Sequence, residues 1–373
     1  MINKILEGLK QEKTIIVILI ITALSCIFVH VTDFTSYIDT YTMGLWFSSM
    51  AVSAGLRENG VFDRLSSVIT KKITNTRTAA FVLVFMTFFS APFLTDAAAL
   101  AFFAPVTVSL LSGGSNGIIM YILSLQTAAA NLGAMIFPAA SVRNLYLYRK
   151  YSLTYGRYFR MIAPLYITAA VILLLLCLIA KKQSVEEKKP VEKKEIESPY
   201  FVVIYVTLYM LNVFAVLGIV SMLTVFASVC LAVVIMEPKI FSDIDYSRLI
   251  LPMSMFVLMG NITQIRELTA FIGRNVSGNV FESTVLFSQL FGNVPSSVFF
   301  SVFSHSPSDM ITAANIGSIG LVSASAAGMY AKRISGESLV SDSAKFPVYC
   351  FGTGIFICAV LYFAYKYIFP LLK

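Results

Sequence analysis

Two short breaks within otherwise apolar stretches constrain the fold of this chain more than any other feature. The first is Ala91-Pro92-Phe93-Leu94-Thr95-Asp96, and the second is Gln289-Leu290-Phe291-Gly292-Asn293-Val294-Pro295. Backbone that is not helical has unpaired amide and carbonyl groups, which a membrane tolerates only where protein buries them or where they line a watery cavity. We therefore expect two re-entrant hairpins, over about 81–111 and 283–303, whose tips lie at a ligand site.

The other apolar segments indicate an integral protein of the cell membrane. Hydrophobic residues make up 57% of the 373-residue chain and charged residues 13%, which excludes a soluble domain of ordinary composition. A helix needs about 20 residues to cross a bilayer. We expect an all-α polytopic protein with about nine transmembrane helices besides the hairpins, at Thr14–Val31, Tyr41–Gly55, Ile118–Val142, Ile162–Ala180, Tyr200–Leu217, Ile219–Met236, Ser247–Asn261, Met310–Tyr330 and Phe346–Ile368. Trp46 and the tyrosines near span ends are interpreted as an interfacial aromatic belt.

A charged linker at 181–198 (KKQSVEEKKPVEKKEIES) divides the chain near its middle. It carries 11 charges in 18 residues, too polar a composition to bury a core of its own. We expect an N-terminal repeat at 1–180 and a C-terminal repeat at 199–373. The net charge of +8 comes from Lys and Arg between apolar segments, so nucleic acid is not an expected partner. Most of these residues are cytoplasmic if the N-terminus and the linker are, although the segment Arg143–Arg160 opposes that orientation.

The two halves resemble each other around their hairpins. When Asn131-Leu132-Gly133 is aligned with Asn315-Ile316-Gly317 without gaps, six of 19 positions are identical. A hairpin precedes this segment in both halves, and an Arg-Glu pair precedes each hairpin. Counting spans from a cytoplasmic N-terminus brings the two hairpins in from opposite sides, so we expect inverted repeats. The alternative is chance similarity among the small residues that pack membrane helices.

These motifs resemble the ion transporter superfamily, in particular its citrate-transporter-like and arsenite-permease branch, and more distantly the divalent anion:sodium symporters. The residues that carry the resemblance occur in family order: Leu94–Leu100, Gln126–Gly133, Asp245-Tyr246-Ser247, Met259-Gly260-Asn261, Asn293-Val294-Pro295 and Asn315–Gly317. The resemblance implies a carrier of two repeats with broken helices, a homodimer, that binds small anions together with Na⁺ or H⁺. Its expected partners are then the anionic solute and membrane lipid.

The first half departs from the family pattern at two places. Thr95-Asp96-Ala97 stands where the family has Thr-Asn-Asp, so the acid is displaced by one position. Ala140–Asn144 stands where the family has Gly-Asn-Pro-Gln-Asn, so the Gly and Pro that break the helix are missing and an arginine, Arg143, is added. We therefore expect an altered site in this half.

Hairpin tips expose backbone carbonyls and the positive N-terminal ends of half-helices, so one site can bind both a cation and an anion. Small and hydroxyl residues suit such a site because the backbone comes close and neutral oxygens are available. In the second half the candidate substrate or ion ligands are Gly292, Asn293, Pro295, Ser296, Asn315, Gly317, Ser318, Gly320 and Ser323, with Na⁺ at Asn293 and Asn315. For any one serine, helix packing is an alternative role.

In the first half the candidate ligands are Thr95, Asp96, Asn131, Gly133, Ser141, Arg143 and Asn144. Asp96 is the only acid between Asp63 and Glu186, and an acid within a membrane is costly unless it is paired or protonated. One hypothesis is that Arg143 approaches Asp96 and its fixed charge replaces a bound cation. A second makes Asp96 a proton carrier, and a third makes Arg143 an interfacial anchor.

These features favour a secondary active transporter of a small anion, a di- or tricarboxylate or an inorganic oxyanion, that uses alternating access and Na⁺ or H⁺ as coupling ion. No other metal and no organic cofactor is expected, since the five cysteines lack metal-ligand spacing. The alternatives are an anion channel and a metalloid efflux permease with a partner ATPase. An enzyme is not expected, because the chain lacks His-Glu-x-x-His and Gly-x-Ser-x-Gly motifs.

Overall fold

The computed structural model describes residues 13–29, 34–61, 64, 73–184, 198–276, 278–338 and 343–372. In these ranges the chain forms helices joined by loops, and the extended pairing described is an isolated bridge between Asn75 and Ser184. The predicted all-α class is confirmed for this part of the chain. Most of the expected linker, 185–197, lies outside the described residues.

Five described helices are long and apolar enough to cross a membrane. They are α5 (Thr76–Leu94), α7 (Asn116–Ala134), α9 (Tyr155–Ile179), α10 (Pro199–Val216) and a final helix, Phe346–Leu371, which comprises α19 (Phe346–Phe363), η5 (Ala364–Ile368) and most of η6 (Phe369–Leu372). A sixth is added if α13 (Ser247–Gln264) and α14 (Arg266–Val276), bent by 103°, form one span. The chain is therefore a multi-pass membrane protein.

The count of nine spans stays a prediction. Helices α2 (Lys13–Phe28) and α11 (Met222–Met236), both expected as full spans, have 16 and 15 residues. Helix α3 (Thr40–Glu58) has 19 residues, but serine, threonine and glycine occur along its length. The short elements η1 (Phe34–Tyr37), α12 (Ile240–Asp243) and η4 (Ser343–Lys345) lie in connections.

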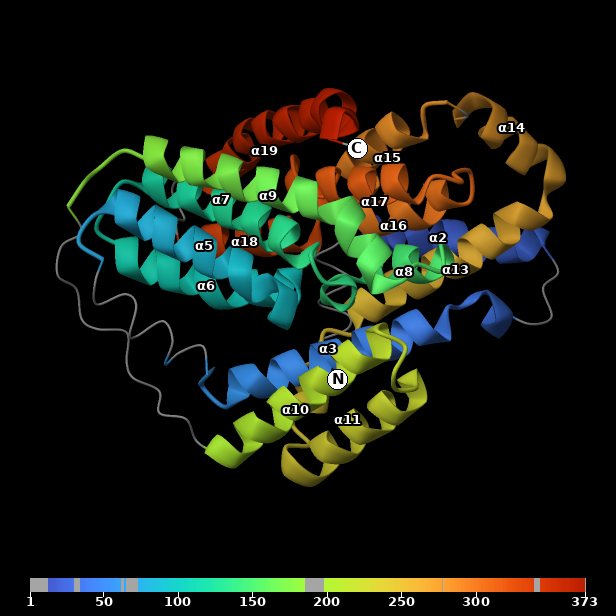
Figure 1. The fold of residues 1–373 in the computed structure, drawn as a ribbon, viewed down its shortest axis with the longest axis horizontal. Coiled ribbons are helices and arrows are strands. Elements are labelled where there is room, and N and C mark those ends of the chain that lie inside the picture. The colour runs from blue at the N-terminus through green and yellow to red at the C-terminus, as the bar shows by residue number, and fades with distance from the viewer. Residues whose placement is uncertain are drawn as a thin grey trace.

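Two groups of helices run in from opposite sides of the molecule and meet at its centre (Figure 1). The first group contains α5, α6 (Asp96–Leu111), α7 and α18 (Ala326–Ser338), and the second contains α15 (Val280–Phe291), α16 (Asn293–Ser301), α17 (Pro307–Ile316) and α8 (Val142–Lys150). In each group, three helices come from one half of the chain and the fourth comes from the other half. Helices α8 and α18 are thus exchanged, so the two halves of the chain do not pack as separate bodies.

The exchange follows from a helix break in each of two apolar segments. Helix α7 ends at Ala134 and α8 begins at Val142, with the turn η2 (Pro138–Ala140) between them. Helix α17 ends at Ile316 and α18 begins at Ala326, with η3 (Val322–Ala324) between them. The predicted broken helices are therefore confirmed, and the segments 118–142 and 310–330 are not continuous spans.

The first break persists although Ala140–Asn144 lacks the family's Gly and Pro. Pro138 lies just upstream and has no N–H to donate to a helix, so the chain turns there instead. In the second break Gly320 has a φ of 128°, which only glycine adopts without strain. Different residues therefore interrupt the helix at corresponding places.

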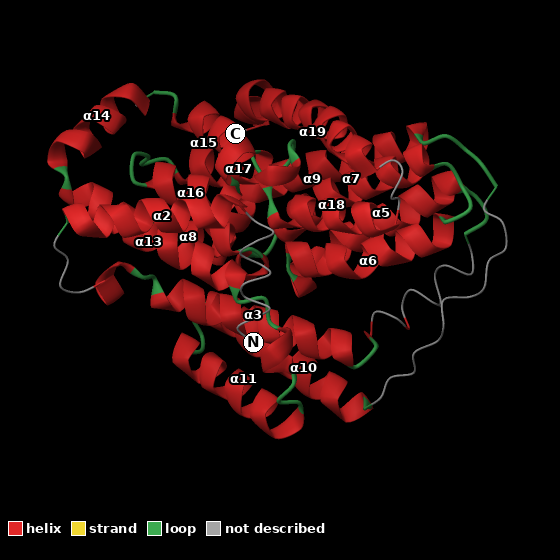
Figure 2. Ribbon diagram, turned by 180° about the vertical axis from the view of Figure 1, so that it is seen from behind, coloured by secondary structure: helices red, strands yellow, loops and turns green. Residues whose placement is uncertain are grey.

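The remaining helices surround these two groups. Helices α3, α10 and α11 form a layer along one side of both groups, as Figures 1 and 2 show from opposite directions. Helix α2 packs on α13, and α13 also contacts α16 of the second group. Helices α9 and α19 both pack on α7. The layer of α3, α10 and α11 is therefore a scaffold that touches both groups.

Helix α19 packs closely on the second break. A Cβ atom at Gly354 of α19 would lie 2.5 Å from Gly320 Cα and 2.6 Å from Gly320 N, so only glycine fits. Gly352, two positions before it in sequence, has no atom within 4 Å of such a Cβ. Small residues thus set the distance between this helix and the centre of the molecule.

Candidate functional site

The two hairpin tips have nearly the same backbone conformation. Thr95 (φ 88°, ψ 155°) joins α5 to α6, and Gly292 (φ 91°, ψ 160°) joins α15 to α16. This conformation is essentially a glycine conformation and costs another residue about 1–3 kcal/mol. The first tip is held by α3, because Ser53 Oγ donates a hydrogen bond to the carbonyl oxygen of Leu94.

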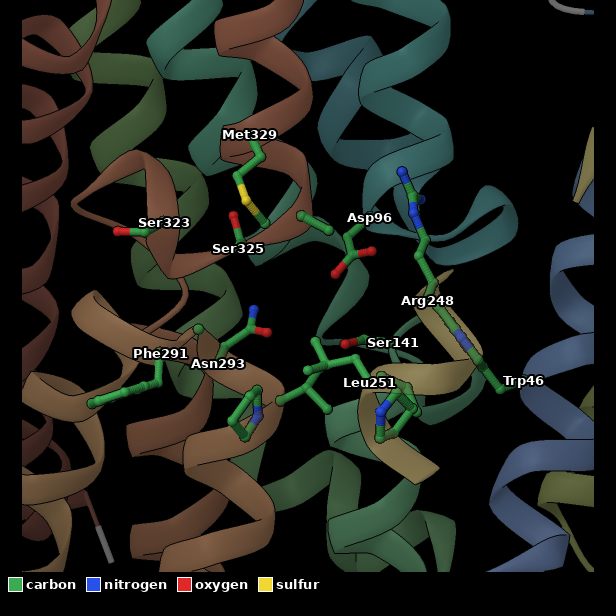
Figure 3. A pocket seen from close by; sticks show the side chains of 16 residues that line it. Trp46, Asp96, Ser141, Arg248, Leu251, Phe291, Asn293, Ser323, Ser325 and Met329 are labelled. Carbon is green, nitrogen blue, oxygen red and sulfur yellow. The ribbon is translucent and has the colours of Figure 1, made fainter. Parts of the chain in front are cut away.

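Both tips reach one pocket at the centre of the molecule (Figure 3). The pocket contains about 680 Å³ of space between atoms, part of it open to the outside. Its lining comes from both tips, both breaks, α3, α13 and α18: Trp46, Asp96, Ser141, Val142, Arg248, Leu251, Pro252, Phe291, Gly292, Asn293, Val294, Pro295, Ser323, Ser325, Ala326 and Met329. Asp96, Ser141 and Arg248 lie on one side and Asn293, Ser323 and Ser325 on the other.

Four helices begin at this pocket, namely α6, α8, α16 and α18, and the first residue of each lines it. The N-terminal end of a helix carries a partial positive charge on its unpaired N–H groups. Ser141, the N-cap residue of α8, is fully buried, and its hydroxyl has no hydrogen-bond partner among the described residues. The pocket therefore offers several donors to a ligand.

The predicted approach of Arg143 to Asp96 is confirmed. Arg143 Nη1 lies 3.0 Å from Asp96 Oδ2, and Arg143 is only 1% exposed. Arg143 Nη2 donates to the carbonyl oxygen of Asn131 and to Oδ1 of Asn315, each at 3.2 Å. The other carboxylate oxygen of Asp96 accepts a hydrogen bond from Ala97 N at 2.7 Å. The interpretation of Arg143 as an interfacial anchor is therefore wrong.

Three asparagines join the two halves of the chain next to Arg143. Asn144 and Asn315 exchange side-chain hydrogen bonds at 3.1 and 2.8 Å, and Asn131 Nδ2 donates to Ser325 Oγ at 3.0 Å. Asn315 Oδ1 thus accepts two hydrogen bonds, one from Asn144 and one from Arg143. Asn293, in contrast, lines the pocket, and its amide makes no hydrogen bond to the described residues.

Several other predicted ligands are used in local structure. The hydroxyls of Ser296 and Ser318 donate to the carbonyls of Gly292 and Asn315. Ser323 lines the pocket, but its hydroxyl donates to the carbonyl of Gln289. Glycines at three predicted positions permit close packing: Gly133 faces the backbone of Phe88, Gly317 faces Ser288, and Gly320 faces Gln289 and Gly354. Of the sixteen predicted residues, Asp96, Ser141, Gly292, Asn293, Pro295 and Ser323 line the pocket.

Arg248 and Trp46 are two of the pocket residues that the sequence interpretation did not include among the candidate ligands. Arg248 pairs with Asp245 through Nε at 3.0 Å, while its terminal nitrogens make no hydrogen bond to the described residues. Its position directly after Asp245-Tyr246-Ser247 was a signal that could have revealed it. Trp46 is 4% exposed and its indole N–H has no partner in the described part of the chain, so its placement in an interfacial belt is wrong.

A comparison with protein-family models identifies the family. The model described as citrate transporter matches residues 5–328, which include both hairpins, both helix breaks and Arg248. The chain belongs to the citrate transporter family. The expected branch of the ion transporter superfamily is thereby confirmed.

The chain is also similar to the inner membrane protein YbiR of Escherichia coli (strain K12). The two share 24% identity over 308 residues, which cover 80% of this chain and 81% of the relative. Citrate transporter family membership places the chain among membrane transporters and is consistent with a role other than that of an enzyme. It agrees with the membrane-spanning helices that the structure describes.

Proposed function

We propose that this protein is a secondary active transporter that carries a small anion, a di- or tricarboxylate or an inorganic oxyanion, across the cell membrane by alternating access coupled to Na⁺ or H⁺. The observation that supports this most is the convergence of both hairpin tips on one central pocket. Broken helices whose ends meet near the middle of the molecule are the usual architecture of substrate sites in such carriers.

The pocket suits an anion. Four helix N-termini point their partial positive charges at it, and the hydroxyl of Ser141 is an unpaired donor beside one of them. Asp96 lines the pocket too, but its charge is balanced by Arg143. Arg248 is the remaining charged lining residue, and its terminal nitrogens make no hydrogen bond to the described residues. A guanidinium fork of this kind binds carboxylates and oxyanions with two parallel hydrogen bonds.

Alternating access would follow from inverted repeats. The two helix groups approach from opposite sides, their tips share one backbone conformation, and each group exchanges one helix with the other. We propose that the groups move relative to the scaffold of α3, α10 and α11. The distribution of Lys and Arg favours a cytoplasmic N-terminus and linker, with 1–180 and 199–373 as the repeats. A homodimer is the assembly that the resemblance implies.

Uptake into proteoliposomes tests the function. Purified protein would be supplied with citrate, succinate, sulfate or arsenite under imposed Na⁺ or H⁺ gradients. Saturable uptake driven by one of these gradients is expected. Flux that follows the anion gradient alone and does not saturate would instead identify a channel. Arsenite movement that needs an added ATPase would identify a metalloid efflux permease.

Binding has an independent readout in the single tryptophan of the chain, because Trp46 lines the pocket. Titration with the transported anion should change its fluorescence at concentrations that match the KM for uptake. Arg248→Gln should raise both constants about tenfold or more, since a hydrogen bond to a charged group contributes about 1.5–3 kcal/mol. Arg157→Gln, which removes an exposed arginine of α9 outside the pocket, is the matched control and should change neither. Equal effects of the two substitutions would argue against an anion at Arg248.

A further inference from the structure

The terminal nitrogens of Arg143 occupy a position lined by oxygens from three separate segments. Asp96 Oδ2 at the first hairpin tip lies 3.0 Å from Nη1, while the carbonyl oxygen of Asn131 in α7 and Oδ1 of Asn315 in α17 lie 3.2 Å from Nη2. A carboxylate, a main-chain carbonyl and an amide oxygen are hard ligands of the kind that coordinate metal cations beside unwound helices. The guanidinium is therefore held where a cation would find its ligands.

We propose that Arg143 is a tethered cation that permanently fills a metal-cation site between the first hairpin tip and the first helix break. The electrostatics support this role. Asp96 contributes one negative charge and Arg143 one positive charge, and their side chains are only 12% and 1% exposed. An added Na⁺ would bring an uncompensated charge into this region, which is costly within a membrane.

The contacts of Arg143 also show which part of the side chain does the binding. Its side-chain hydrogen bonds to the described residues come from Nη1 and Nη2, whereas Nε has no partner among them. Free guanidinium has the same terminal N–H groups as the arginine head. Removal of the side chain should therefore leave a site of net negative charge that accepts either a small metal cation or guanidinium.

The role of Arg143 has one consequence for transport, which rests on the proposed function. It has another for cation binding, which is independent of the proposed function. If the protein is a coupled carrier, its coupling ion does not bind beside Asp96 at the first tip. Cation binding to a variant without the arginine can be measured on purified protein in the absence of any transport. Failure of one consequence is thus distinguishable from failure of the other.

The experiment measures thermal unfolding of Arg143→Ala in detergent at constant ionic strength, with choline, Na⁺ or low-millimolar guanidinium as the cation. The variant should have a lower Tm than the wild type in choline. Saturating Na⁺ or guanidinium should raise its Tm by about 3 °C or more beyond any rise in the wild type, because a ligand that binds only the folded state stabilises it. The absence of an excess response to both cations would overturn the proposal.

Two further variants identify the ligands. Asp96→Asn combined with Arg143→Ala removes both charges and should lose the response to Na⁺ and guanidinium, and an undiminished response would also overturn the proposal. Arg157→Ala is the matched arginine substitution on an exposed surface and should respond as the wild type does. If Arg143→Ala cannot be purified, Arg143→Lys replaces it in the experiment. The ammonium group of lysine is again a tethered cation, so the Tm of this variant should respond to added Na⁺ no more than that of the wild type. A larger response would contradict the role of residue 143 as a tethered cation.

Discussion

The close contact between α19 and the second helix break leads to a prediction that a single methyl group can test. In Gly354→Ala the new Cβ would lie 2.5 Å from Gly320 Cα, whereas carbon atoms in favourable contact are about 3.5–4.0 Å apart. The nearest atoms belong to the backbone, so they cannot rotate away as a side chain would. Overpacking of this kind costs about 1–3 kcal/mol in the free energy of unfolding.

Gly352→Ala is the control, because it makes the same change in the same helix where no atom lies within 4 Å. Alanine is favoured over glycine in a helix interior by about 0.8–1.0 kcal/mol, and both variants receive this gain. We therefore expect Gly352→Ala to be about 1 kcal/mol more stable than the wild type. Gly354→Ala should be less stable than Gly352→Ala by about 1–3 kcal/mol, because the gain in helix propensity is the same in both variants and only the cost of overpacking differs.

Thermal unfolding of the two variants in detergent, run in parallel with the wild type, measures the difference. At about 2 °C for each kcal/mol in a protein of this size, the Tm of Gly352→Ala should exceed that of Gly354→Ala by about 2–6 °C. Uptake should fall in Gly354→Ala only, because its helix is displaced from the break that lines the pocket. Equal Tm values for the two variants would refute the packing of α19 on Gly320.

Two more predictions concern the tip and the asparagine pair. Gly292→Ala should lower the free energy of unfolding by about 1–2 kcal/mol because φ is 91°, although the nearest atom to the new Cβ is 3.6 Å away and does not clash. The variant should also lose uptake, since Gly292 lines the pocket. Gly278→Ala is the control: its φ is 88° but it lies outside the pocket, so it should lose similar stability and keep uptake. Asn144→Ala should cost about 1–3 kcal/mol by removing the two hydrogen bonds that Asn144 and Asn315 exchange. In a double-mutant cycle with Asn315→Ala the two costs should be less than additive, and full additivity would show that the pair does not interact.

The features that were predictable from the sequence depend on local signals. Both hairpin tips were located because an acid or an Asn-x-Pro motif interrupts an apolar run, and such interruptions have few explanations within a membrane. The cost of an isolated intramembrane charge indicated that Asp96 is paired or protonated, and the family resemblance placed Arg143 on a broken helix beside it, so the pair was one of three hypotheses. The structure confirms the pair.

The features that were missed depend on tertiary structure. Nothing local distinguishes Trp46 in a pocket from a tryptophan at the interface, because both positions suit an aromatic ring with one polar atom. Serine hydroxyls such as that of Ser296 can bond either a ligand or the carbonyl four residues earlier, and here the carbonyl takes the bond. The exchange of α8 and α18 could not be predicted from the sequence either, because helices that pack through small residues fit more than one neighbour.

The exchange of α8 and α18 has a consequence for how the chain is made. Helices α5, α6 and α7 are synthesised long before α18. The first helix group is therefore incomplete in the membrane, without α18, until the last part of the polypeptide has been made. Helix α8 is likewise synthesised before α15, α16 and α17, on which its group depends. If the chain is divided at the linker, each fragment should therefore be unstable when expressed alone. The two fragments should assemble when both are present in the same membrane, because each supplies the helix that the other lacks.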